Sequence, residues 1–259
     1  MSEETAKIHV QSRGGVGWIT LDHPPLNVIT TAMAKAICEA IETFDADSQS
    51  KIIVFTASGE RAFAAGADVG EHTLENVRAL NDQLFALVRC LMRPVGKPRI
   101  AAVKGICSGG ANELAFACDF VVAREDTRFA TPEIKIGAVG SLGALMMARF
   151  MSPGKALELA LNGDWMSAAD ARSFGLVTQV LPLDGYETEL RKYLARFTSK
   201  SMAAMWIGRK QFRQLVQPIS DSVLTELSRS LMQETIALED SQEGVAAFLE
   251  KRKPVWKDR

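Results

Sequence analysis

The spacing of apolar residues along the chain predicts a layered α/β core in its first half. Apolar segments at residues 8–10 and 17–21 flank the pair Gly14-Gly15, which is typical of a β-hairpin. Continuous apolar runs, which indicate strands buried on both faces, occupy residues 51–56, 98–105 and 119–124. Segments with helical spacing lie between these elements, at residues 30–44, 74–92 and 111–117. Strands that alternate with helices in this order predict a parallel sheet with right-handed crossovers.

Beyond Pro132 the pattern becomes mainly helical. Amphipathic spacing predicts helices at residues 142–151, 154–161, 168–174, 187–198, 201–215, 220–238 and 242–251. We therefore expect an α/β core over residues 1–195 and a helical C-terminal region over residues 196–259. Because no flexible linker separates the two parts, we expect the helical region to pack on the core or on another subunit.

Composition and charge narrow the classes of function. The 259 residues are 47% hydrophobic and 24% charged, which is ordinary for a globular protein. Lys and Arg number 30 and Asp and Glu 31, so the net charge of −1 favours neither a nucleic-acid partner nor a membrane surface. The polar residues 1–5 do not resemble a secretory signal, and the apolar run 136–148 is too short to span a bilayer. We expect a cytoplasmic protein.

Neither cysteine nor histidine spacing indicates a metal site. The four cysteines show no CxxC pair, and the three histidines are scattered. Buried, reduced thiols are the ordinary interpretation of such cysteines. We expect no metal.

Two small-residue segments follow predicted strands. Residues 62–68 form a loop of Ala and Gly whose backbone can come close to a ligand, although an ordinary tight turn has the same composition. Residues 105–113 place Gly109-Gly110 between a buried strand and a helix, where free N–H groups and the helix dipole can bind an oxyanion. Glu113 falls in the first turn of that helix, where a carboxylate can also serve only to stabilise the dipole.

A second carboxylate lies in apolar surroundings at residues 129–137. Pro132 fixes the backbone before Glu133, and a carboxyl group among apolar neighbours tends to have a raised pKa and to act as a proton donor. A Pro-Glu pair that merely begins a helix is the alternative. The glycines at residues 137–143 do not have the spacing of a dinucleotide-binding loop. No motif supports an acyl-enzyme nucleophile.

Taken together and in order, these segments resemble the enoyl-CoA hydratase/isomerase (crotonase) family over nearly the whole chain. The matching segments are residues 21–27, 62–68, 98–113, 131–137, 161–177 and 243–252. The resemblance implies a crotonase-like ββα spiral core with a helical C-terminal trimerisation region. It also implies an enzyme that binds acyl-CoA thioesters and stabilises an enolate.

The resemblance assigns roles to four residues of the reaction centre. The backbone N–H groups of Ala67 and Gly110 would form the oxyanion hole, in agreement with the small-residue loops that carry them. Glu113 and Glu133, which are 133 − 113 = 20 positions apart, would hold one water between them. Glu113 would be the base-like partner and Glu133 the acid. Two carboxylates favour the addition of water to the 2,3 double bond of an enoyl-CoA.

The resemblance also places the coenzyme A portion of the substrate. The adenine and phosphates would lie near Asn27, Val28, Ala65 and Asp68, with help from the basic residues Lys251 and Lys257. The chain departs from the usual family pattern at Ala111, at Ala130-Thr131 and at residues 140–144, where Leu142 stands in the stretch that shapes the acyl pocket. We expect Leu142 to contact the acyl group.

Several functional alternatives stay open at this point. The segment 66–72 resembles that of hydratases acting on cyclic dienoyl-CoA thioesters in anaerobic aromatic degradation, and an enoyl-CoA isomerase would use one glutamate on the same fold. A non-catalytic binding or assembly protein is the alternative from another class. We expect no cofactor beyond the coenzyme A of the substrate, no nucleic-acid partner and no membrane partner. The family resemblance and the apolar C-terminal helices predict a homotrimer or homohexamer.

Overall fold

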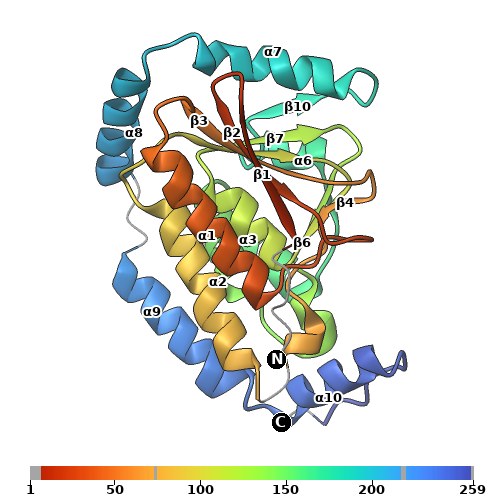
Figure 1. Ribbon diagram of the computed structural model, residues 1–259. Coiled ribbons are helices and arrows are strands. Elements are labelled where there is room, and N and C mark those ends of the chain that lie inside the picture. The colour runs from red at the N-terminus through yellow and green to blue at the C-terminus, as the bar shows by residue number, and fades with distance from the viewer. Residues whose placement is uncertain (1–6, 73–74, 217–219, 258–259) are drawn as a thin grey trace.

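A computed structural model of the protein describes residues 7–72, 75–216 and 220–257 (Figure 1). The polar segment 1–5 and Leu74, the first residue of the helix predicted at residues 74–92, lie outside the described residues. The strands are β1 Ile8–Arg13, β2 Val16–Leu21, β3 Ile52–Ala57, β4 Ala62–Ala64, β5 Arg99–Val103, β6 Ile106–Ser108, β7 Phe120–Arg124, β8 Arg128–Ala130, β9 Met166–Ser167 and β10 Gln179–Leu181. The α-helices are α1 Thr31–Ala46, α2 Val77–Met92, α3 Gly110–Ala117, α4 Ser141–Met147, α5 Pro153–Asn162, α6 Ala168–Ser173, α7 Tyr186–Thr198, α8 Met202–Val216, α9 Asp221–Ser230 and α10 Glu239–Leu249. Short helical segments are η1 Val69–Glu71, η2 Pro132–Ile136 and the π-helical η3 Leu231–Thr235.

The main sheet has six strands in the order β1-β2-β3-β5-β7-β10. β1 and β2 pair antiparallel as the predicted hairpin, and the other neighbours are parallel. α1 connects β2 to β3, and α2 and α3 lie in the next two connections. The predicted alternation of strands and helices is confirmed, and β10 adds an edge strand in a part of the chain with a mainly helical pattern.

A second sheet of four short strands, in the order β4-β6-β8-β9, is not predicted by the hydrophobic pattern. Its strands have only two or three residues, which is too short for periodicity to show, and β4 lies in the segment 62–68 that we expected to be a loop. Each of β3, β5 and β7 is followed by one short strand, and the first two of these pairs lead into a helix. This is the ββα repeat that the family resemblance implies.

The central strands β3, β5 and β7 of the main sheet are buried on both faces, which explains their continuous apolar runs. In β3, Ile53 and Phe55 face the cluster formed with the helices α1, α2 and α3. Ile52 and Val54 face the opposite cluster, which contains Leu190 and other residues of α7. Since neighbouring side chains of a strand point to opposite faces, every position of such a strand is apolar.

The C-terminal helices wrap around the core instead of forming a detached unit. α9 packs on α2, and α10 packs on η2 and η1 (Figure 1). The boundary expected at residues 195–196 falls inside α7, and the division into two parts stays a prediction. The single helix predicted at residues 220–238 is wrong: α9 ends at Ser230, and the chain continues as the π-helical η3. Within the described ranges, no helix combines the length and apolarity that a membrane span requires.

Candidate active site

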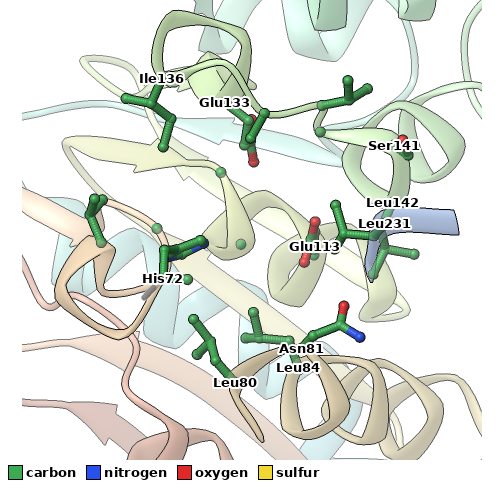
Figure 2. Close-up of a pocket in the computed structure, with 18 of the residues that line it drawn as sticks. His72, Leu80, Asn81, Leu84, Glu113, Glu133, Ile136, Ser141, Leu142 and Leu231 are labelled. Carbon is green, nitrogen blue, oxygen red and sulfur yellow. The ribbon is translucent and has the colours of Figure 1, made fainter. Parts of the chain in front are cut away.

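A cavity of about 360 Å³ lies at the carboxyl ends of the short strands (Figure 2). The segments after β4, β6 and β8 form its inner side, and α2, α4 and the C-terminal helices close around it. A cavity of this size is within the range of small-molecule sites. Six of the candidates named from the sequence line it: Ala65, Ala67, Gly110, Glu113, Glu133 and Leu142.

The second sheet brings the three sequence motifs together. β6 pairs in parallel with both β4 and β8, so the three strands end at the same edge. The chain leaving β4 carries Ala67, the chain leaving β6 carries Gly110 and Glu113, and the chain leaving β8 carries Glu133. Ligands commonly bind at the carboxyl edge of parallel strands.

The two residues that carry the expected oxyanion donors, Ala67 and Gly110, lie close together at this edge. Ile29 N–H donates to the Gly66 carbonyl and Asp68 N–H donates to the Ile29 carbonyl, so the Ala67 N–H, which alternates with that of Asp68, points the other way. A Cβ atom placed on Gly110 would lie 3.5 Å from Ala67 N. Gly66 has a φ of +109°, and a Cβ there would be 3.1 Å from the Ser108 carbonyl oxygen, so only glycine permits this close approach. Two backbone donors at the beginning of a helix can stabilise a developing oxyanion.

Glu113 and Glu133 project into the same cavity from α3 and η2 (Figure 2). Burial and, to a smaller extent, the nearby charge of Glu133 together raise the pKa of Glu113 to about 8. Burial also raises the pKa of Glu133 to about 7. Two neighbouring carboxyl groups in a low-dielectric site resist carrying two negative charges, so the pair holds about one proton near neutral pH.

The Glu133 carboxyl group is enclosed by backbone. A Cβ on Gly140 would lie 2.7 Å from Glu133 Oε2, and one on Gly109 would lie 3.1 Å from Oε1. Oε2 is buried and has no hydrogen-bond partner among the described residues. A buried carboxyl oxygen without a partner is unfavourable, which favours a bound water or substrate group at this point.

The outer wall of the cavity is mostly apolar. It includes Leu142, as expected, together with residues that the motif analysis missed: Leu80, Leu84, Leu227, Leu231 and Phe248. Two polar residues, His72 and Asn81, were missed as well. His72 Nδ1 lies 2.9 Å from the Asp68 carbonyl oxygen. Asn81 shares one face of α2 with Val77 and Leu84, and a polar residue in an apolar stripe is the signal that could have indicated it.

Five candidates from the coenzyme A prediction lie outside the described lining of this cavity: Asn27, Val28 and Asp68, and the C-terminal Lys251 and Lys257. Asn27 is buried, its amide accepts from the His23 N–H and donates to the carbonyls of Ser58 and Ala62, and it has a left-handed φ of 52°. Its amide thus fixes a turn next to the loop that carries Ala67. Val28 accepts through its carbonyl from His23, and Asp68 accepts from the Gly70 N–H. Their role in binding coenzyme A stays a prediction.

The two C-terminal basic candidates follow α10 and are exposed. Lys257 pairs with Glu239 at 3.0 Å, and Lys251 lies at the end of α10, the helix whose Phe248 lines the cavity. Within the described part of the chain, no group of three His, Cys, Asp or Glu side chains is arranged to hold a metal ion. Independence of metals and cofactors stays a prediction.

Comparison with known proteins agrees with the motifs. The family model for enoyl-CoA hydratase/isomerase matches residues 11–259. A probable enoyl-CoA hydratase of Rhizobium meliloti is 36% identical over 100% of both chains, and a mitochondrial enoyl-CoA hydratase of Pongo abelii is 34% identical over 94% of this chain and 84% of its own. The crystal structure of an enoyl-CoA hydratase from Mycobacterium avium subsp. paratuberculosis superposes with a TM-score of 0.86 at 28% identity, covering 98% of this chain and 100% of that one. The fold is therefore that of the crotonases, and the protein belongs to the enoyl-CoA hydratase/isomerase family.

Proposed function

We propose that the protein is a hydro-lyase that adds water across the 2,3 double bond of enoyl-CoA thioesters. The observation that carries this proposal is the convergence of two carboxyl groups of raised pKa with two backbone donors in one cavity. Its full-length relatives named as enoyl-CoA hydratases support the same reaction.

The thioester carbonyl oxygen would accept hydrogen bonds from the N–H groups of Ala67 and Gly110. As water adds to C3, negative charge moves onto this oxygen, and the donors stabilise the enolate more than the ground state. The dipole of α3, which begins at Gly110, acts in the same direction. Small residues at this point leave the thioester room to reach the backbone.

The glutamate pair would move the protons. The ionised partner takes a proton from water while the hydroxyl oxygen bonds to C3, and the protonated partner gives its proton to C2. The pair begins and ends with one proton, which lies on the opposite partner after the addition. This state is the one that the reverse reaction requires, and transfer of the proton back between the two carboxyl groups restores the pair for the next forward turnover. Family resemblance assigns Glu113 as base and Glu133 as acid. Raised pKa values near neutrality allow the proton to rest on either, as a reversible reaction requires.

Product mass tests this proposal against its alternatives. The protein would be incubated with linear and cyclic unsaturated acyl-CoA thioesters, without added cofactor and with a metal chelator. A gain of one water supports a hydratase, and a gain confined to cyclic dienoyl thioesters identifies that substrate class. Unchanged mass with a moved double bond would instead identify an isomerase. Tight binding without any conversion would identify a non-catalytic binding protein.

The proposal extends to coenzyme A contacts, assembly and location. Ala65 lines the cavity, and Lys251 follows the helix that closes it, which supports a coenzyme A path along the edge formed with Asn27, Val28 and Asp68.

For assembly, α8 exposes large apolar side chains: Trp206, Ile207, Phe212 and Leu215. Such a face supports a trimer or hexamer. Sedimentation at micromolar concentration tests it, and a stable monomer would refute it. Similarity to bacterial relatives supports a cytoplasmic location.

A further inference from the structure

The mostly apolar outer wall of the cavity contains a buried side-chain amide, that of Asn81. Asn81 of α2 is only 3% exposed and lines the cavity together with Leu84, Leu227 and Leu231. In Figure 2 its side chain points from α2 toward the part of the cavity next to Glu113 and Leu142. A leucine or methionine would continue this apolar wall, so the amide calls for an explanation.

Within the described residues, the Asn81 amide forms a hydrogen bond through its Nδ2 atom but not through its Oδ1 atom. Asn81 Nδ2 lies 2.7 Å from Ser228 Oγ of α9, which helps to hold α9 against α2. Asn81 Oδ1 is buried and has no hydrogen-bond partner among the described residues. A purely structural link between the helices accounts for the first contact and leaves the second group unexplained. Buried amide groups are rarely left unpaired, which points to a partner supplied by a ligand.

The residues around the Asn81 amide favour an uncharged ligand group as its hydrogen-bond partner. The basic side chains in the described lining are His72 and Lys135. His72 lies against the Asp68 carbonyl, beside the oxyanion loop, and a Cβ on Gly163 would meet Lys135 Cε at 3.0 Å, which places that side chain at the end of α5. Neither faces the leucines around Asn81, so a carboxylate on the acyl group would be buried there without a counter-charge.

A hydroxyl group fits the amide best. The Ser228 hydroxyl can donate or accept, so the amide can turn either its oxygen or its NH₂ group toward the cavity. A hydroxyl on the ligand can pair with both. We propose that Asn81 recognises an uncharged hydroxyl group on the acyl portion, beyond C3, so that the enzyme favours a hydroxylated enoyl-CoA over its hydrocarbon counterpart. This inference rests on the proposed function.

Matched substrates test the proposal first in the wild-type protein. 2-Hexenoyl-CoA would be compared with its 4-, 5- and 6-hydroxy derivatives, with hydration followed by product mass and by loss of the conjugated-thioester absorbance. One added hydrogen bond to a buried amide should raise kcat/KM about tenfold or more for at least one position of the hydroxyl. Equal or lower kcat/KM for all three derivatives would overturn the proposal, whatever the variants do.

Two variants of α2 then test whether Asn81 causes the preference for the hydroxylated substrate. Asn81→Leu keeps the branched shape and the number of side-chain heavy atoms, continues the apolar wall, and should abolish or reverse the preference for the hydroxyl. Gln83→Leu makes the same chemical change two positions away, where the amide lies 4.0 Å from Cys38 Sγ of α1 and outside the cavity lining, and should leave the preference intact. A preference that survives in Asn81→Leu would contradict the assignment.

A binding measurement separates this proposal from the hydratase proposal. Calorimetry with saturated hexanoyl-CoA and its hydroxy derivatives needs no turnover. If no thioester gains water but the hydroxyl still improves binding in the wild type and not in Asn81→Leu, hydration fails and recognition by Asn81 stands. If hydration proceeds with no such preference, the hydratase proposal stands and recognition by Asn81 fails.

Discussion

Two groups of buried carboxylates in the described part of the protein have opposite surroundings. Asp119, beneath α8, accepts from Arg209 Nε at 2.6 Å, from Arg213 Nε at 2.7 Å and from the Arg99 backbone N–H at 2.8 Å. Burial alone would raise the pKa of Asp119, but the two arginines hold it below its usual value. In the cavity, Glu113 and Glu133 face each other with no such cations contributing, and the pKa of each is raised.

The difference separates a structural charge from a reactive one. A buried charge with full hydrogen bonding holds α8 on the core and has no proton to exchange near neutral pH. Glu113 and Glu133 form a buried carboxyl pair without a cationic partner, which lowers the stability of the fold. The pair keeps one proton that it can exchange near neutral pH, and hydration requires such a proton. Replacing each carboxylate by its amide breaks the two sites in different ways.

The largest expected effect is on turnover. Glu113→Gln and Glu133→Gln keep the shape and remove a proton-transfer group, so each should lower kcat for hydration by about 10²–10⁴-fold. The double variant should lose much less than the product of the two factors, because both residues serve one step. Steady-state rates at saturating thioester measure this. Full hydration activity in either single variant would remove that glutamate from the mechanism.

The same chemical change at Asp119 should act on stability instead. Asp119→Asn leaves two buried arginines without their counter-charge, and the free energy of unfolding should fall by about 3–5 kcal/mol. Urea titration measures this, and kcat of the folded fraction should stay near the wild-type value. The exposed pair Glu226–Arg229 supplies the control, since Glu226→Gln should leave the urea midpoint unchanged. Equal midpoints for Asp119→Asn and wild type would refute the structural role.

Blocking the oxyanion hole should remove activity without touching either carboxylate. A Cβ on Gly110 would stand 3.5 Å from Ala67 N, in the space that the thioester oxygen needs. Gly110→Ala should therefore lower kcat by about 10²–10³-fold, the effect of losing one oxyanion donor. Gly154→Ala is the matched control in the first turn of α5, because no atom lies within 4 Å of the added Cβ. Comparable rates for the two variants would place the thioester elsewhere.

The two sites should also lose stability at opposite ends of the pH scale. The pKa of Glu113 rises from 4.5 to about 8 in the folded protein. Below pH 4.5 the group is neutral in both the folded and the unfolded state, and the free energy of unfolding then falls as pH rises toward 8. Each pKa unit in this window contributes about 1.4 kcal/mol, and Glu113→Gln should gain stability relative to wild type as pH rises. The pKa of Asp119 is lowered in the folded protein, so its ionised form stabilises the fold above pH 3.8. This stabilisation is lost as pH falls below 3.8. Parallel pH–stability curves for wild type and Glu113→Gln would contradict this.

The sequence identifies the motifs that carry the site residues. It does not predict the short strands that bring these motifs together in space. Glu113 and Glu133 stand in recognisable segments, and the long strands that precede them have clear apolar runs. Their meeting depends on β4, β6 and β8, which have three residues each and no readable periodicity. The main sheet follows from local pattern, whereas the second sheet is a consequence of the tertiary fold.

The walls of the cavity show the same limit. Leu142 lies near a motif and was expected there, but Leu227 and Leu231 reach the cavity only because α9 packs on α2. Asn27 was expected from its motif to lie near coenzyme A, which stays a prediction; the three hydrogen bonds of its side chain within the protein could not be read from the motif. Motifs identify residues that matter without stating which group each one contacts.

The shared proton is the central claim, and difference infrared spectroscopy of the carboxyl groups tests it most directly. Spectra of wild type minus the Glu113→Gln/Glu133→Gln double variant, recorded from pH 5 to pH 9, isolate the pair from the other carboxyl groups. Raised pKa values of about 8 and about 7 predict a protonated carboxyl band that persists at pH 6.5 and disappears by about pH 9. A difference spectrum that shows two ionised carboxylates already at pH 6 would contradict the claim.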